Sequence, residues 1–326
     1  MKKKLAVGLS TLLAVTAIAG STAFASTTEA KTYKIGICQL VQHVALDAAT
    51  EGFMDAVKEG LGEENVEFDL QNASGDSATC STIVNSFVAA GYDLILANAT
   101  APLQAAAQAT ADIPILGTSV TDYASALDIT DWTGKTGYNV SGTSDLAPLS
   151  EQAAMVKELF PDAKTVGILY CTAEANSQYQ ADVMTEELTA LGYEVTSFAF
   201  TDTNDVATVT QNACDACDVI YIPTDNTAAS NTGIIDQIAR PAGVPIVAGE
   251  EGVCKGCGVA TLSISYYDLG YTTGQMAVDI LANGADITEM DVQYASEVTK
   301  EYNAEICEEL GVQVPDDYIA IETSEE

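Results

Sequence analysis

Short apolar runs recur along the chain, and a polar or glycine-containing break follows each of them. Three precede residue 137 and three follow residue 150, at 33–38, 93–97, 112–117, 165–170, 218–222 and 243–249. The runs are rich in β-branched residues, which is typical of strands buried on both faces of a parallel sheet. Ile113-Pro114 and Val244-Pro245 occupy the same place in the two series, at the beginning of a strand, where a missing N–H is tolerated. The pattern predicts two similar α/β lobes joined by a hinge at Gly137–Ser150.

Between these runs the apolar residues follow a helical period. In 45–60 the residues Leu46, Phe53 and Val57 share one face, and Gly60 or Gly62 ends the helix. Asp76 or Ser77 can cap the next helix. Further helices are expected at 102–110, 176–191, 205–213, 228–240, 269–281 and 303–310, and further strands at 66–70 and 193–199. Alternating strands and helices predict doubly wound sheets, whose ligands bind outside the carboxyl ends of the strands.

The N-terminus has the three parts of a secretory signal peptide. Lysines at 2–4 precede an apolar run at 5–19, and Ala23-Phe-Ala25 provides the cleavage pattern. The run is shorter than the ~20 residues of a spanning helix. We therefore expect 1–25 to be removed from an exported soluble protein, the alternative being an uncleaved anchor. The first cysteine, Cys38, lies inside a predicted strand, so no lipid anchor is evident.

Charge excludes some classes of partner. The chain has 326 residues, enough for two domains, and 48% of them are hydrophobic. Without residues 1–25, nine basic residues stand against 47 acidic ones, a formal net charge of −38. Such a surface repels phosphate backbones and anionic lipids, so we expect no nucleic acid as partner.

Eight cysteines leave three readings open. Cys214-x-x-Cys217 and Cys254-x-x-Cys257 form two close pairs. In an exported chain they are compatible with disulfides, with buried free thiols, or with a four-thiolate zinc site, although their separation is wider than that of common zinc ribbons. The binding prediction below includes no metal and no cofactor.

Polar residues that follow the strands are the candidate ligand contacts. The first half supplies uncharged groups, and the second half adds carboxylates: Gln39, His43, Asn98, Thr100, Thr118 and Ser119, then Glu174, Asn176, Ser177, Thr224, Asp225, Asn226 and Glu250. Hydroxyls at helix N-termini suit a carboxylate, and Asp or Glu suits an ammonium group. A zwitterion between the lobes would satisfy both sets. The structural alternative is that Thr100, Ser119, Asn176 and Asp225 are ordinary helix caps.

Catalysis has little support in the sequence. The chain contains no Gly-x-Ser-x-Gly elbow, no Walker loop and no His-x-x-x-His pair. His43 is the only histidine, and a lone histidine after a strand is more typical of a structural or ligand-contacting role. We expect a binding protein and not an enzyme.

Several stretches, taken together, resemble the extracytoplasmic solute-binding proteins of ABC importers, in the family that includes tryptophan- and tyrosine-binding members. They cover nearly all of the mature chain: Ile35–Phe53, Ala105–Thr110 with Asp112–Pro114, Gly142–Leu146, Val166–Tyr170 with Glu174–Ser177, Tyr221–Thr227, and Tyr266–Gly270.

The resemblance implies a type I periplasmic-binding fold, with two Rossmann-like lobes of parallel sheet joined by a three-stranded hinge. The first lobe would comprise 33–140 and 266–291, and the second 141–265 and 292–326. The ligand would be an aromatic amino acid, namely tryptophan, tyrosine or phenylalanine, that a monomeric protein passes to a membrane permease.

Carried onto matching positions, the resemblance gives residue roles. Thr100 and Ser119 would hold the ligand carboxylate, Asp225 with Glu174 or Glu250 would meet the amine, and His43 and Tyr170 would border the side chain. A branched-chain amino acid, a peptide or a sugar is the alternative ligand, and a sensory ligand-binding domain is the alternative role. Members of this family from Gram-positive cells commonly carry a lipid-anchoring cysteine, which is missing here, and the cysteine pairs are not part of the family pattern.

Overall fold

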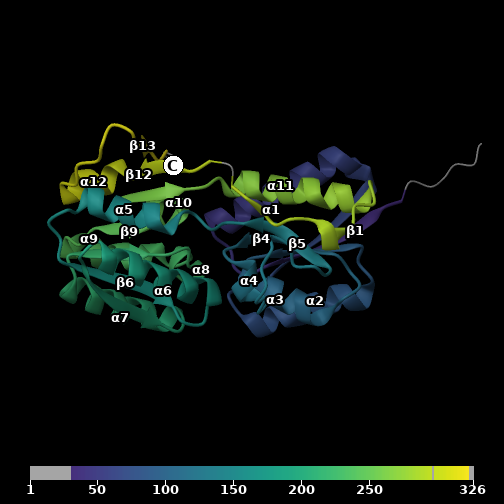
Figure 1. Ribbon diagram of the computed structural model, residues 1–326, viewed down its shortest axis with the longest axis horizontal. Coiled ribbons are helices and arrows are strands. Elements are labelled where there is room, and N and C mark those ends of the chain that lie inside the picture. The colour runs from purple at the N-terminus through teal and green to yellow at the C-terminus, as the bar shows by residue number, and fades with distance from the viewer. Residues whose placement is uncertain (1–30, 296, 323–326) are drawn as a thin grey trace, which may run out of the picture. The chain divides into compact units, whose positions relative to one another are not determined.

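The structure, a computed structural model, describes residues 31–295 and 297–322 (Figure 1). The predicted signal peptide lies outside these residues. Two β-sheets are present, and both belong to one unit defined by its contacts, Thr32–Glu326. No helix of the described part is long and apolar enough to cross a membrane.

The first sheet consists of parallel strands in the order β11-β5-β4-β3-β1-β2. Helices α1 (Val44–Leu61) and α11 (Tyr266–Leu281) cover one face, and α2 (Ser77–Ala90) and α3 (Thr100–Ala109) cover the other (Figure 1). The strands are β1 (Tyr33–Gln39), β2 (Val66–Asn72), β3 (Leu94–Asn98), β4 (Ile115–Val120), β5 (Val140–Ser144) and β11 (Gln293–Tyr294).

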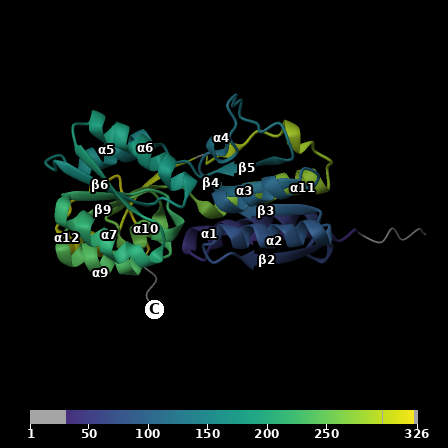
Figure 2. The same ribbon diagram turned by 90° about the horizontal axis from the view of Figure 1, so that it is seen from below.

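The second sheet has the order β13-β12-β10-β9-β8-β6-β7, and only the β10–β12 pair is antiparallel. Helices α5 (Leu149–Leu159) and α6 (Ala175–Ala190) lie on one side of β6, and α7 (Thr203–Ala216) and α9 (Thr232–Ala242) lie on the other (Figure 2). The strands are β6 (Thr165–Cys171), β7 (Glu194–Phe200), β8 (Val219–Ile222), β9 (Ile246–Ala248), β10 (Ala260–Ser263), β12 (Thr299–Tyr302) and β13 (Ile319–Ala320). The shorter helices of the described chain are α4 (Tyr123–Ala126), α8 (Asn226–Ala229), α10 (Glu251–Cys257) and α12 (Ala304–Leu310).

Most predicted elements are present, and prolines explain two shifted boundaries. The strands expected at 112 and 243 begin at Ile115 and Ile246, directly after Pro114 and Pro245, which have no N–H to donate to the sheet. The helix expected at 228–240 is instead two helices, α8 and α9. Asp225 caps the first with its side chain, and Asn231, whose backbone is not helical, separates the two.

The chain passes between the sheets three times, after β5, after β10 and after β11. Residues 141–144 and 293–294, which the predicted boundaries assigned to the second lobe, pair in the first sheet. The second passage leads into α11, which lies along α1. A Cβ atom on Gly270 would collide with the backbone of Ala49, and one on Gly274 with that of Phe53. The close packing of α11 on α1 therefore depends on these two glycines.

All eight cysteines are free, and seven of them are buried. Removal from water raises the pKa of the Cys254 and Cys257 thiols, which keeps them protonated and unreactive. The described residues contain no group of three or more His, Cys, Asp or Glu arranged to hold a metal ion. Among the three possibilities for the cysteines, the structure contains free thiols, and all but Cys214 are buried.

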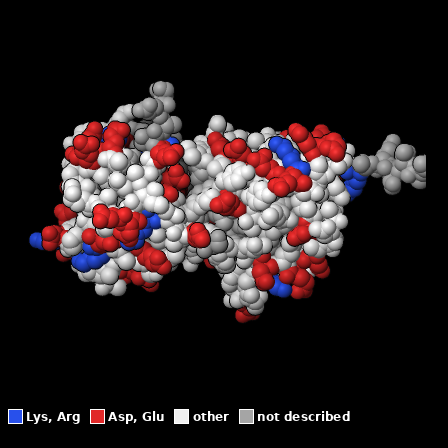
Figure 3. Space-filling model, turned by 90° about the horizontal axis from the view of Figure 1, so that it is seen from above, with Lys and Arg blue, Asp and Glu red and all other residues white. Residues whose placement is uncertain are grey.

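Acidic residues dominate the face of the molecule in Figure 3. Red Asp and Glu residues are scattered over this face, with fewer blue Lys or Arg residues between them. The distribution agrees with the excess of 47 acidic over 12 basic residues in the whole chain.

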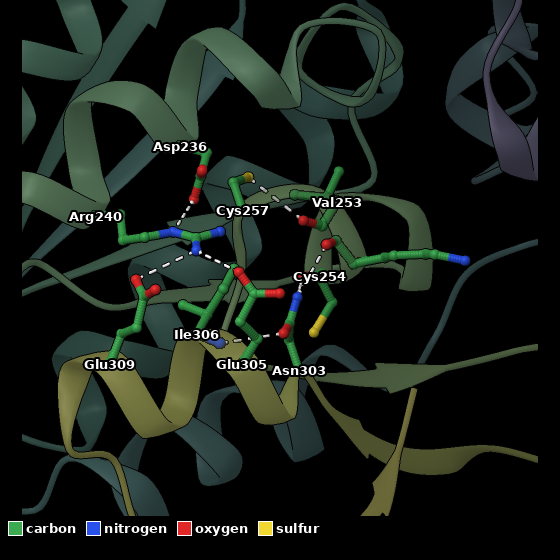
Figure 4. A network of polar contacts seen from close by, with 10 residues as sticks. Asp236, Arg240, Val253, Cys254, Cys257, Asn303, Glu305, Ile306 and Glu309 are labelled. Atoms are coloured by element: carbon green, nitrogen blue, oxygen red, sulfur yellow. Dashed lines mark hydrogen bonds and ion pairs between the residues drawn. The ribbon is translucent and has the colours of Figure 1, made fainter. Parts of the chain in front are cut away.

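Arg240, the chain's single arginine, joins α9 to α12 (Figure 4). Its guanidinium bonds to Asp236 at 2.8 Å, Glu305 at 2.9 Å and Glu309 at 3.2 Å. On the neighbouring side of α12, Asn303 donates from Nδ2 to the Lys255 carbonyl at 2.9 Å and accepts from the Ile306 N–H. These contacts hold the C-terminal helix against α9 and α10.

Replacing Arg240 with Gln should lower the free energy of unfolding by about 1 to 2 kcal/mol, because three carboxylates then face one another without a cation. Urea denaturation measures the change. Lys300→Gln is the matched control, since Lys300 bonds only to Glu158 and Asp317 and is more exposed than Arg240. The control should cost less than 1 kcal/mol. An equal loss in both variants would contradict a special role for Arg240.

Glu301 on β12 makes stability depend on pH. Removal from water, together with the nearby charge of Glu251, raises the pKa of Glu301 to about 7 from its ordinary 4.5. Because the folded pKa is raised, the protonated acid stabilises the fold at low pH, and this contribution is lost as pH rises through about 7. Glu301→Gln should therefore raise the melting temperature at pH 8 and leave it nearly unchanged at pH 4, below the ordinary pKa of 4.5. The exposed Glu308→Gln serves as control, and an equal gain for Glu301→Gln at both pH values would refute the prediction.

Candidate functional site

The predicted ligand contacts lie where the strands of both sheets end. On the first sheet Asn98 ends β3, Ser119 lies near the end of β4, and His43 immediately precedes α1. On the second sheet Glu174 follows β6 and Asp225 follows β8. One direct contact joins the two sets, between His43 Nε2 and Asn226 Oδ1 at 3.1 Å.

A pocket lies beside this contact. Its volume is only about 10 Å³, and both sheets contribute to its lining: His43, Leu46, Asp145, Thr224, Asp225, Asn226, Ala229, Glu250 and Tyr266. Five of these nine residues were predicted from the sequence. The space is below the 300–1,000 Å³ typical of ligand pockets, so a ligand of that size requires His43 and Asn226 to separate.

The first sheet presents polar atoms that have no partner within the protein. Among the described residues, seven buried side-chain N or O atoms have none, and four of them belong to predicted contacts: His43 Nδ1, Asn98 Oδ1, Thr100 Oγ1 and Ser119 Oγ. Buried polar atoms are normally paired, so unpaired ones call for an explanation. A bound ligand with polar groups supplies one.

The backbone is strained at the same place. Ala99 has φ +104° and Ser119 has φ +56°, a region that side-chain-bearing residues rarely adopt and that is concentrated at functional sites. Ala99 precedes α3 and provides no side-chain cap, so the N–H groups of Thr100 and Ala101 are left for another acceptor, whereas Pro102 has no N–H and Leu103 N bonds to the Ala99 carbonyl. Together with the Thr100 and Ser119 hydroxyls, they form a set of donors that suits an anionic group.

The second sheet presents carboxylates that cap helices. Glu174 accepts from the backbone N–H of Asn226 at 3.0 Å and of Thr227 at 2.8 Å, at the beginning of α8. Asp225 accepts from Ala228 N at 2.8 Å and from Cys171 N at 2.6 Å. Glu250 accepts from Gly252 N and Val253 N at the beginning of α10. The cap reading therefore holds for Asp225, and not for Thr100, Ser119 or Asn176, none of which caps a helix with its side chain.

Burial changes the protonation of these carboxylates. Desolvation, aided by the charge of Glu174, raises the pKa of Asp225 to about 7. Desolvation also raises the pKa of Glu250, and the neighbouring His43 partly opposes the change. A positive group entering the pocket would favour the charged forms of both acids.

Three predicted contacts are occupied elsewhere in the fold. The Gln39 amide donates to Asp47 and Val41 and accepts from Thr50, against α1. Thr118 lies 3.2 Å from the hydroxyl of Thr143, in the layer between the first sheet and α11. The ring of Tyr170 belongs to the core under α5 and α6. None of the three lines the pocket, because their side chains point into packed layers.

The remaining predicted contacts support the site without lining the pocket. Asn176 donates to the carbonyl of Thr224 at 3.0 Å and to Ser177 Oγ at 3.3 Å. Asn98 donates to the Leu46 carbonyl at 2.8 Å while its Oδ1 stays unpaired. Both amides fix the loops that follow the strands.

Four pocket residues were not predicted from the sequence, the apolar Leu46 and Ala229 and the polar Asp145 and Tyr266. The Tyr266 hydroxyl donates to Asp145 Oδ2 at 2.9 Å, and the Thr121 hydroxyl donates to Oδ1 at 3.0 Å. Asp145 directly follows β5, and Tyr266 begins α11 just after β10. A strand-end rule applied to β5 and β10 would have found both, and both lie in stretches that carry the family resemblance.

Comparisons with known proteins agree with this architecture. The tyrosine-binding protein of Clostridioides difficile (strain R20291) is 36% identical over 289 residues, which are 88% of this chain and 83% of that protein. The ABC domain from Streptococcus pneumonia, solved in complex with L-Trp, is 32% identical with a TM-score of 0.83, covering 88% of this chain and 97% of that one. A ligand-free, open substrate binding protein with adhesive properties from Clostridium difficile is 37% identical with a TM-score of 0.68, covering 90% and 100%.

The two mostly parallel sheets, the three passages between them and these structural neighbours together establish the type I periplasmic-binding fold. The family profile described as ABC transporter substrate binding protein matches residues 34–325, nearly the whole of the described chain. This protein belongs to the family of ABC transporter substrate-binding proteins.

Proposed function

We propose that the protein captures an aromatic amino acid outside the cytoplasm and delivers it to an ABC permease. The main support is that the two sheets supply different groups to the site. The first sheet has unpaired hydroxyl and amide atoms beside a helix N-terminus, and the second has buried carboxylates. An α-amino acid carries the complementary carboxylate and ammonium groups on one carbon atom. The names of the relatives, a tyrosine-binding protein and a protein in complex with L-Trp, support an aromatic side chain.

The proposed pose assigns each end of the ligand. The carboxylate bonds to the N-terminus of α3 with the hydroxyls of Thr100 and Ser119, and the ammonium group lies among the pocket carboxylates. Leu46 and Ala229 offer the ring an apolar surface. The ligand enters when His43 and Asn226 separate, and their contact re-forms over it.

The proposed role also includes the protein's location and its oligomeric state. The protein acts as an exported monomer that binds and releases its ligand without chemical change. Contact with the permease is part of the same proposal.

Thermal melting of residues 26–326 with each of the twenty amino acids, and with several sugars and short peptides, tests the proposal. Ligand at 100 times its dissociation constant stabilises a protein by about 2.7 kcal/mol, which raises the melting temperature of a chain this long by several degrees. The rise should occur with tryptophan, tyrosine or phenylalanine. A rise with leucine, a sugar or a peptide alone would contradict the aromatic assignment, and no rise with any compound would contradict amino-acid binding.

Thr100→Val and Ser119→Ala should each weaken binding of the aromatic amino acid about 10- to 100-fold, because each removes a hydrogen bond to a charged carboxylate. The unliganded variants should melt at or slightly above the wild-type temperature, since neither hydroxyl has a partner within the protein. Isothermal titration and melting curves provide the two readouts.

Thr210→Val is the matched control for these variants. Thr210 on α7 is also fully buried with an unpaired hydroxyl, but it does not lie at the strand ends. Its affinity should equal that of the wild type. Affinity losses of the same size in all three variants would show that the hydroxyls act through general stability and not through the ligand.

A further inference from the structure

The pocket holds three carboxylates whose bonding differs. Asp145, Asp225 and Glu250 are each 3% exposed or less. Asp225 and Glu250 accept backbone N–H groups at helix N-termini, where the aligned peptide dipoles favour a negative charge. Asp145 accepts two hydroxyl groups, from Thr121 and Tyr266, and does not lie at a helix N-terminus. Asp145 is therefore the carboxylate with the least internal compensation for its charge.

No cationic lysine or arginine lies in this pocket. The only basic group among its lining residues is His43, which contacts Asn226. A buried carboxylate without a cation is costly, and desolvation accordingly raises the pKa of Asp145. A ligand ammonium group is the kind of partner that would compensate the negative charge of the Asp145 carboxylate.

Asp145 also stands close to the proposed carboxylate-binding atoms. Thr121, which donates to Asp145, comes two residues after Ser119 at the same end of β4. The two charged groups of an α-amino acid are attached to a single carbon, so their partners must be neighbours. Ser119 and Asp145 meet this requirement within one sheet, whereas Asp225 reaches the ligand only from the other sheet.

We propose that Asp145 is the counter-ion of the ligand's ammonium group, and that Tyr266 is a positioning residue that orients its carboxylate. The inference deepens the proposed function and rests on it. It also moves the ammonium contact from Asp225, the residue favoured by the sequence, to a residue on the first passage between the sheets.

A two-by-two experiment isolates the contact. Wild type and Asp145→Asn are each titrated with the amino acid that gave the largest melting shift and with its desamino acid, which keeps the ring and the carboxylate but lacks the amine. The wild type should prefer the amino acid by about 100-fold or more, as expected for a desolvated charge pair. Asp145→Asn should lose most of this preference while binding the desamino acid at least as well as the wild type does.

Asp225→Asn and Glu250→Gln are the matched controls, because each neutralises another pocket carboxylate while retaining an oxygen that can cap its helix. Both should keep at least a tenfold preference for the amino acid. Loss of the preference in Asp225→Asn but not in Asp145→Asn would overturn the inference. An equal loss of affinity for both ligands in Asp145→Asn would also overturn it, since that result would mean that the hydrogen bonds of Asp145 have only a structural role. A wild type that binds no amino acid defeats the proposed function itself and is thereby distinguishable.

Tyr266→Phe gives a second test, which decides the matter if Asp145→Asn does not fold. Without the hydroxyl the Asp145 carboxylate loses one of its two hydroxyl donors, so the pH below which the amine preference disappears should move upward relative to wild type. An unmoved midpoint would refute the inference. The profile is read against the other titrating groups near Asp145 and its pocket, which are His43, Tyr123, Glu174, Asp225 and Glu250.

Discussion

The site depends on a conflict between burial and charge. Asp145, Asp225 and Glu250 surround one pocket almost out of contact with water, and no lysine or arginine lies beside them. Two of them obtain partial compensation from helix N-termini, while the third depends on hydroxyl groups. Such an arrangement is stable only at a cost in free energy, and a ligand with a positive end lowers that cost. The proposed selectivity for a zwitterion over a neutral or anionic solute rests on the same imbalance.

Two of the residues involved, Asp145 and Tyr266, lie on the segments that connect the two sheets. Asp145 lies on the first passage between the sheets and Tyr266 at the end of the second, and their hydrogen bond joins the two. Beyond the second passage, α11 is held tightly to α1 because Gly270 and Gly274 allow the backbones to touch. In the proposed pose, the ligand's ammonium group at Asp145 would act on the segments that connect the lobes, next to a helix pair with little freedom to adjust. Binding and lobe closure can be coupled through a few atoms.

Sequence patterns were sufficient for the fold wherever strands consist of apolar runs. The six short apolar runs of the sequence correspond to β1, β3, β4, β6, β8 and β9. The strand β5, Val-Ser-Gly-Thr-Ser, was missed because its buried positions are filled by Ser141 and Thr143, whose hydroxyls bond to Met290 and Thr273. Such partners come from segments more than a hundred residues away, which no local pattern reveals. Missing β5 also meant missing Asp145, the residue that follows it.

For the candidate ligand contacts, the sequence predicts the position of a residue better than the direction of its side chain. Position after a strand correctly places Thr100, Ser119 and Asp225 at the strand ends, but it does not say which way a side chain points. Tyr170 shows the difficulty, because β6 is buried on both faces, and Tyr170 shares a core with α5 and α6 while Leu169 and Cys171 face α7. Direction within a doubly covered strand depends on register against helices that are distant in sequence. The unpaired hydroxyls of Thr100 and Ser119 and the strained backbone at Ala99 and Ser119 support the proposed ligand contact at this place, since such features persist only where the surrounding structure enforces them.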